Sequence, residues 1–190
     1  MHITTPLTPE VIRQLHAGDT VTLSGTIYTA RDAAHMRMMD CLDRGESLPF
    51  DPRGQVVYYA GPTPARPGEV VGAIGPTTSV RMDMFTPRLL DQGLAGMIGK
   101  GGRGPAVVES MRKNGAVYFI AIGGAAALMA GCIRSLEVIA WDDLGPESVK
   151  KLQVENLPLV VAIDAEGRNA FEEGQAEYRA MFGSGEACKE

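Results

Sequence analysis

Residues 94–124, LAGMIGKGGRGPAVVESMRKNGAVYFIAIGG, contain the pattern that decides the fold class. The apolar runs at 94–99 and 117–124 predict two buried strands, and the segment between Pro105 and Gly115 predicts a helix. Proline suits the first helical turn, and glycine suits the position just past the last one. A strand, helix, strand unit of this length predicts parallel strands joined by a right-handed crossover.

The same alternation extends from this unit in both directions. Strands are predicted at 20–30, 137–143 and 157–164, helices at 31–45 and 77–93, and two further apolar runs at 56–61 and 70–75 enclose a loop rich in proline and glycine. The segment 146–156 lies between the last two strands, where the alternation predicts a helix. We therefore expect an α/β protein with a mainly parallel sheet, one domain over residues 1–182 and a flexible tail at 183–190.

The composition excludes several classes of protein. The chain has 190 residues, 45% of them hydrophobic, a formal net charge of -5 and no apolar run of 18 residues, so we expect neither a membrane span nor a general nucleic-acid binder. The N-terminus lacks the basic start and apolar core of a secretory signal, which favours the cytoplasm. Cys41, Cys132 and Cys188 are far apart and show no metal-ligand spacing, so no metal site is expected in this chain.

The loop GKGGRG, residues 99–104, matches the pattern G-x-G-x-x-G after a strand and before a helix. The rest of a dinucleotide fingerprint is missing, because the loop is not in the first strand-helix unit and the next strand ends without an acidic residue. A Walker A loop also fails, since Gly101 stands where Ser or Thr would coordinate magnesium. A nucleotide or small-anion module built on this loop remains the alternative function, and glycine flexibility alone does not explain Lys100 or Arg103.

Two other strand-to-helix junctions carry similar side chains. In TARDAAH, Arg31 lies one helical turn before His35, and Thr29 with Asp32 fits a helix capping box. In GPTTSVRMD, Thr77 and Thr78 precede Arg81. Such junctions are where α/β sheets bind ligands.

Arg31, Arg81 and Lys100 thus lie at three sheet edges of an acidic chain. Three converging cations would repel one another unless an anion neutralised them, which predicts a small ligand with several negative charges. The planar fork of arginine suits a carboxylate in particular.

Three motifs, TARDAAH, YYAGPTPARPGEVVGAIGPTTSVRMD and GMIGKGGRG, occur in this order and spacing. In these three motifs the chain resembles the β subunit of the class I iron-sulfur hydro-lyases, the family that contains class I fumarate hydratase and L-tartrate dehydratase. The resemblance extends from Leu7 to Phe182. It implies a swivelling β/β/α fold in three layers, with a mainly parallel sheet and a second, smaller sheet.

The resemblance also implies a function, a partner and a cofactor. The chain would be the β subunit of an enzyme that hydrates fumarate to malate or dehydrates tartrate, active only with its α subunit, as an α2β2 heterotetramer. By the same resemblance the α subunit would supply three cysteines that hold a 4Fe-4S cluster, and the three cysteines of this chain fall outside every matching motif.

The family's site residues can be carried over to matching positions. Arg31, Arg81 and Lys100 would bind the substrate carboxylates. Thr77 would be the catalytic base, with Thr78 as the alternative hydroxyl. The resemblance leaves the role of Arg103 open. We expect supporting roles, orienting the arginines and completing hydrogen bonds, for Asp32, His35 and Asp83.

Overall fold

The computed structural model describes residues 1–121 and 126–182. Its strands are β1 (His2–Thr4), β2 (Thr20–Thr29), β3 (Val56–Tyr58), β4 (Gly96–Gly99), β5 (Val117–Ile120), β6 (Ile133–Ala140) and β7 (Val149–Ile163). Its α-helices are α1 (Pro9–Ile12), α2 (Asp32–Asp43), α3 (Thr86–Asp91), α4 (Pro105–Asn114), α5 (Ala126–Gly131) and α6 (Ala170–Phe182). Two 3-10 helices, η1 (Ser79–Met82) and η2 (Asp142–Glu147), complete the described elements.

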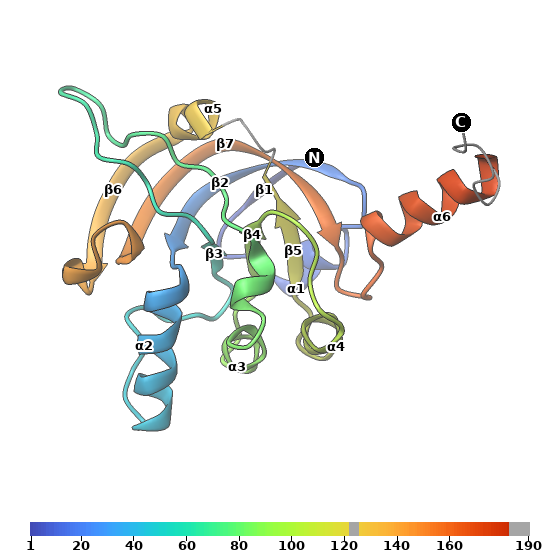
Figure 1. The fold of residues 1–190 in the computed structure, drawn as a ribbon, viewed down its shortest axis with the longest axis horizontal. Coiled ribbons are helices and arrows are strands. Elements are labelled where there is room, and N and C mark those ends of the chain that lie inside the picture. Colours follow the sequence, from blue (N-terminus) through green and yellow to red (C-terminus); the bar gives the residue numbers. More distant parts are fainter. Residues whose placement is uncertain (122–125, 183–190) are drawn as a thin grey trace, which may run out of the picture.

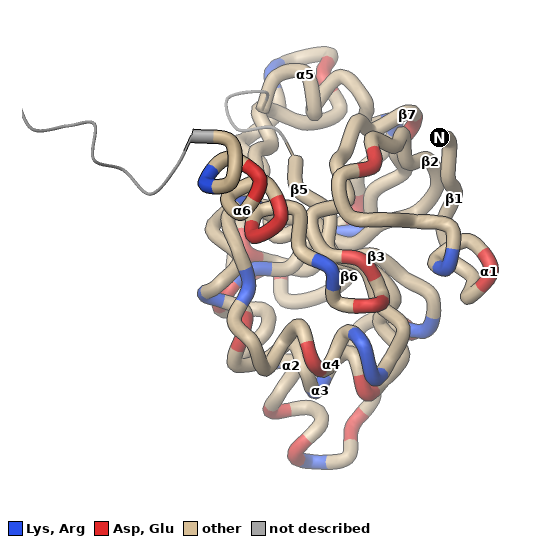
Figure 2. The backbone as a smooth tube through the Cα atoms, turned by 90° about the vertical axis from the view of Figure 1, so that its right-hand side faces the viewer, with Lys and Arg blue, Asp and Glu red and all other residues tan. Residues whose placement is uncertain are grey.

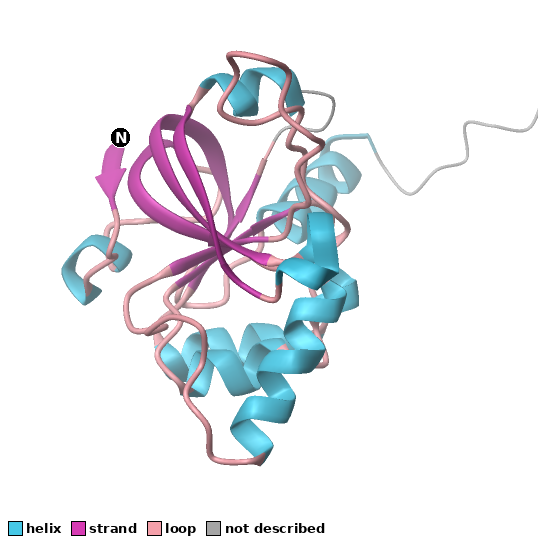
Figure 3. Cartoon of the chain, turned by 90° about the vertical axis from the view of Figure 1, so that its left-hand side faces the viewer, coloured by secondary structure: helices cyan, strands magenta, loops and turns pink. Residues whose placement is uncertain are grey.

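The strands of the described residues form one sheet that closes on itself. Their order is β1-β2-β3-β4-β5-β7-β6, and β2 also pairs with β7, which closes the sheet like a barrel (Figures 1 and 3). The pairings from β1 to β5 are parallel, whereas β7 is antiparallel to β2, β5 and β6. The α/β class is therefore confirmed. The resemblance implied a main sheet and a second, smaller one, whereas the described strands pair into a single sheet.

Alternate residues of the central strands point into two different cores. Val56 and Tyr58 of β3 belong to a cluster with Phe119 of β5, whereas their neighbours Val57 and Tyr59 belong to a second cluster. The second cluster includes helix residues from α2, α3 and α4, which lie along one side of the sheet in Figure 1. Burial on both faces explains why these strands are continuous apolar runs in the sequence.

The expectation of a helix at 146–156 is wrong, because most of this segment is the first half of β7. From Lys151 to Glu155 the side chains are alternately exposed and buried, with Leu152 and Val154 inside. This period of two is typical of a strand with one buried and one solvent-exposed face. The antiparallel part of the sheet follows from this one strand.

The helix predicted at 77–93 is interrupted. The structure has η1, then a turn, then α3, in which Pro87 occupies the first helical turn. Proline has no N–H to donate to the preceding turn, so it begins a new helix rather than continuing one. The helix predicted from Pro105 is confirmed, with Gly115 in a left-handed C-cap at φ 66°.

Some expectations fall outside the described residues. They are the end of the strand predicted at 117–124, the tail at 183–190 and Cys188. Within the described ranges no helix is long and apolar enough to cross a membrane. Basic and acidic positions are interspersed along the backbone in Figure 2.

Candidate functional site

The candidate residues lie where neighbouring parallel strands end. β2, β3 and β4 are adjacent and run the same way, so their carboxyl ends share one edge of the sheet. Arg31 follows β2 and is the N-cap of α2, and Lys100 follows β4. The Thr77 N–H donates to the Tyr59 carbonyl at 2.7 Å, which ties the threonine segment to the end of β3.

Arg31 and Arg81 converge on one carboxylate. Asp32, the first residue of α2, has Oδ1 2.9 Å from Arg81 Nη2 and Oδ2 3.8 Å from Arg31 Nη2. The Arg81 side chain is half exposed, whereas the Arg31 side chain is mostly covered and its Nε is buried without a hydrogen-bond partner. The half-exposed Arg81 guanidinium therefore keeps donors that an added carboxylate could reach, whereas Arg31 Nε is not accessible to one.

The threonine segment and the glycine loop are joined by backbone hydrogen bonds. The Lys100 N–H donates to the Thr77 carbonyl at 3.2 Å, and the Ser79 N–H donates to the Lys100 carbonyl at 3.0 Å. Thr77 is partly buried and Thr78 is exposed. Lys100 is exposed, and its amine makes no ion pair within residues 1–121 and 126–182. The structure thus places Lys100 beside the threonines.

His35 is fully buried under this edge. Its Nδ1 lies 2.8 Å from the Arg31 carbonyl oxygen, which only accepts, so Nδ1 carries the proton. Nε2 has no hydrogen-bond partner, and the ring packs edge-on against Tyr59, with centroids 5.4 Å apart. Burial lowers the pKa of His35 to about 4, so the imidazole is neutral. This neutral ring supports the backbone of Arg31 from below.

Arg103 is a buried structural arginine, which answers the open question about its role. Its side chain is fully buried, Nε donates to Asp83 Oδ1 at 2.7 Å, and Nη2 donates to Thr86 Oγ1 at 2.7 Å. The guanidinium also stacks on the rings of Tyr59 and Tyr118, 5.3 and 5.1 Å from their centroids. Arg103 therefore anchors the glycine loop to the helix layer, and Asp83 serves that anchor rather than the other arginines.

Gly99 is required by packing. A Cβ at this position would overlap Ser79 Oγ and lie 3.0 Å from Tyr59 Cδ2. Ser79 is itself fixed, because its hydroxyl lies 2.8 Å from the Tyr118 hydroxyl, which donates onward to the Gly101 carbonyl at 2.9 Å. The loop around Lys100 is thus held from the inside.

These contacts weigh against a pyrophosphate site in the glycine loop. The Gly104 N–H, at the start of α4, already donates to Asp83 Oδ2 at 2.6 Å. A phosphate there would have to displace that carboxylate and would be repelled by it. The N-terminus of α4 would attract an anion, but the Asp83 carboxylate already occupies that position.

Sequence reasoning missed Glu147. The predicted capping box is wrong, because the N-cap of α2 is Arg31, which makes no side-chain cap, and the Thr29 hydroxyl has no partner. Glu147 Oε2 instead accepts from the Ala33 N–H at 3.0 Å, while Oε1 lies 3.3 Å from Arg31 Nη2. No local signal could reveal this contact, since Ala33 and Glu147 are 114 positions apart.

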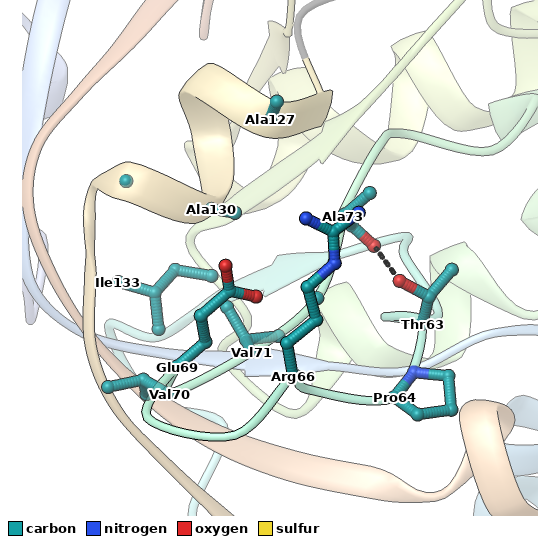
Figure 4. A pocket seen from close by; sticks show the side chains of 12 residues that line it. Thr63, Pro64, Arg66, Glu69, Val70, Val71, Ala73, Ala127, Ala130 and Ile133 are labelled. Carbon is teal, nitrogen blue, oxygen red and sulfur yellow. Dashed lines mark hydrogen bonds between the residues drawn. The ribbon is translucent and has the colours of Figure 1, made fainter.

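A pocket of about 470 Å³ lies elsewhere, between the loop before η1 and the segment α5–β6 (Figure 4). Arg66 and Glu69 are its charged residues, and the Thr63 hydroxyl donates to the Ala73 carbonyl at its wall. None of the candidate site residues lines it.

Comparisons with known proteins agree with one another. The family model described as Fumarase C-terminus matches residues 1–174. The putative L(+)-tartrate dehydratase subunit beta of Methanocaldococcus jannaschii is 38% identical over 88% of this chain and 89% of its own length. The L(+)-tartrate dehydratase subunit beta of Escherichia coli is 35% identical over 95% and 89%, respectively. The aerobic class I fumarate hydratase of Salmonella typhimurium is 37% identical over 88% of this chain, but the match spans only 30% of that enzyme.

Proposed function

Because the chain belongs to the fumarase C-terminal family, we propose that it is the β subunit of a hydro-lyase acting on a small 2-hydroxy dicarboxylate. The substrate would be malate, in exchange with fumarate, or tartrate. The observation that carries the proposal is the Arg31–Asp32–Arg81 cluster beside Lys100, in a chain that aligns with nearly the whole length of two named β subunits. The fold would be the swivelling β/β/α type, with β2 and β7 connecting its parallel and antiparallel parts.

The 4Fe-4S cluster would belong to the α subunit. Cys41 is buried and Cys132 partly buried, and the part of the chain that the structure describes holds no group of three His, Cys, Asp or Glu able to bind a metal. The donor set of these residues does not fit a 4Fe-4S cluster. In line with the family resemblance, we propose that the α subunit of an α2β2 complex holds the cluster, which would supply a Lewis acid to the substrate hydroxyl.

This chain would bind the carboxylates and move the proton. Arg31, whose side chain is 24% exposed, would anchor one carboxylate through its guanidinium group. Removing a proton from the carbon next to the other carboxylate pushes charge onto that group. Arg81 and Lys100 would stabilise this charge, which would favour the transition state over the ground state.

Thr77 would transfer the proton. A threonine hydroxyl is a very weak acid, and nearby cations lower the cost of its alkoxide. Its segment is hydrogen-bonded to Lys100 and precedes η1, which carries Arg81. Thr78 is the alternative and is more exposed. Single Thr77→Val and Thr78→Val variants would assign the role by the larger loss of turnover.

Reconstitution tests the proposal. The chain would be purified alone and together with its α subunit, iron and sulfide being supplied without oxygen. Hydration of fumarate and dehydration of malate and tartrate would then be measured. We expect activity only in the complex. Activity of this chain alone, or a loaded complex inactive on all three acids, would contradict the proposal.

A further inference from the structure

We infer that Glu147 is a positioning residue for Arg31, and that the turn preceding β7 sets how tightly the enzyme holds its dicarboxylate. This inference rests on the proposed function of Arg31. Glu147 ends η2, and its two carboxylate oxygens reach different parts of the same junction. One lies 3.3 Å from the Arg31 guanidinium, and the other accepts from the Ala33 N–H at 3.0 Å.

The contact to Ala33 fixes the start of α2. The first N–H groups of a helix have no partner inside the helix, and the positive end of the helix dipole favours a carboxylate. With no side-chain cap from Arg31 itself, Glu147 supplies this cap from a distant part of the chain. The same carboxylate therefore fixes both the backbone that carries Arg31 and the guanidinium at its end.

The turn that carries Glu147 is built around a buried lysine. Lys150 is 6% exposed, and its amine donates to the Gly145 carbonyl at 2.8 Å, the Pro146 carbonyl at 3.2 Å and the Ser148 hydroxyl at 2.6 Å. Burial lowers the pKa of Lys150. These bonds fold the turn around the ammonium group, so Glu147 is presented from a fixed support.

Gly61 packs closely against the Arg31 side chain and restricts its conformation. A Cβ on Gly61 would lie 3.3 Å from Arg31 Cδ and 3.0 Å from the Pro146 carbonyl, so only a glycine fits comfortably between the arginine and the turn. Arg31 Nε is buried and unpaired. Glu147 therefore contacts one part of the guanidinium, and the exposed 24% of the Arg31 side chain remains for a ligand carboxylate.

The test is Glu147→Gln, which keeps the side-chain length and an oxygen acceptor for Ala33 but removes the charge opposite Arg31. In the reconstituted enzyme we expect KM for the dicarboxylate to rise at least fivefold and kcat to stay within twofold, because the lost interaction orients a binding group. Asp143→Asn is the matched control. Asp143 lies in η2, as Glu147 does, and pairs with Arg37 of α2. The control should leave both constants unchanged.

Two further measurements separate positioning from a general structural role. In an Arg31→Ala background, Glu147→Gln should add no further rise in KM, whereas a structural effect would add fully. In this chain alone, without the α subunit, the NMR signal of the Arg31 Nε–H group should shift in Glu147→Gln and not in Asp143→Asn. This readout needs no enzymatic activity.

The outcomes are distinguishable. A wild-type complex without turnover would contradict the proposed function, and the NMR comparison would still decide whether Glu147 orients Arg31. An unchanged Arg31 signal, an unchanged KM, or a lower KM in Glu147→Gln would overturn the inference. A lower KM would mean that Glu147 competes with the ligand rather than orienting its receptor.

Discussion

Replacing Gly99 by alanine tests whether this glycine serves packing. The new Cβ would overlap Ser79 Oγ, and Ser79 cannot turn away without losing its 2.8 Å contact with the Tyr118 hydroxyl. Overpacking of a tight core costs about 1–3 kcal/mol, and a lost hydrogen bond about 1 kcal/mol more. We expect Gly99→Ala to lower the free energy of unfolding by about 2–4 kcal/mol, or Tm by roughly 5–15 °C.

Urea unfolding of the purified chain, followed by circular dichroism, measures this change. Gly102→Ala is the matched control in the same loop, because no atom lies within 4 Å of its added Cβ and its φ is outside the left-handed region. It should be neutral or slightly stabilising. Ser79→Ala combined with Gly99→Ala should be more stable than Gly99→Ala alone, since the overlapping oxygen is gone. A stable Gly99→Ala variant, or strictly additive costs, would refute the packing argument.

Four further outcomes are expected. Arg81→Ala should lower turnover of the reconstituted enzyme on the order of 100-fold, by loss of a charge-stabilising donor, while Arg88→Ala, an exposed pair elsewhere, should not. Lys100→Arg should also impair steady-state turnover, because the two cations differ in shape and hydration; normal kinetics would place Lys100 in solvent. Arg103→Met should destabilise the chain by about 3–5 kcal/mol in urea, since it strands a largely buried carboxylate. The pKa of His35 is about 4 in the folded chain and 6.5 as its ordinary value. The free energy of unfolding should therefore fall by about 3 kcal/mol as the pH is lowered from 6.5 to 4. His35→Asn should remove most of this pH dependence, as measured by urea unfolding at several pH values.

The parallel half of the fold could be predicted from the sequence because its strands are buried on both faces. Continuous apolar runs with Pro105 and Gly115 bounding the helix between them are local signals, and the structure confirms them. The antiparallel half was missed, although the alternation from Lys151 to Glu155 was available in the sequence. This alternation is short, and the segment lies between two predicted strands. The strand-helix order of the rest of the chain therefore favoured a helix at this position.

The site was only partly predictable for a related reason. Strand ends and helix starts are local features, so Arg31, Arg81 and Lys100 could be placed at one edge. Their partners come from distant parts of the chain, and nothing near Arg31 in the sequence indicates Glu147. The burial of Arg103 was equally hidden, because its partners Asp83 and Thr86 lie in a different turn.

The pairing of β2 with β7 also has a consequence for the order in which the molecule can form. β2 ends at Thr29 and β7 begins at Val149, so closing the sheet joins segments made at very different times during synthesis. Long-range pairings of this kind form late, because a large loop must close first. A chain still on the ribosome and lacking residues beyond 146 would contain α2 and its arginine, but not the carboxylate that orients it. Competence to bind a dicarboxylate would therefore be acquired only after the turn that carries Glu147 has been synthesised.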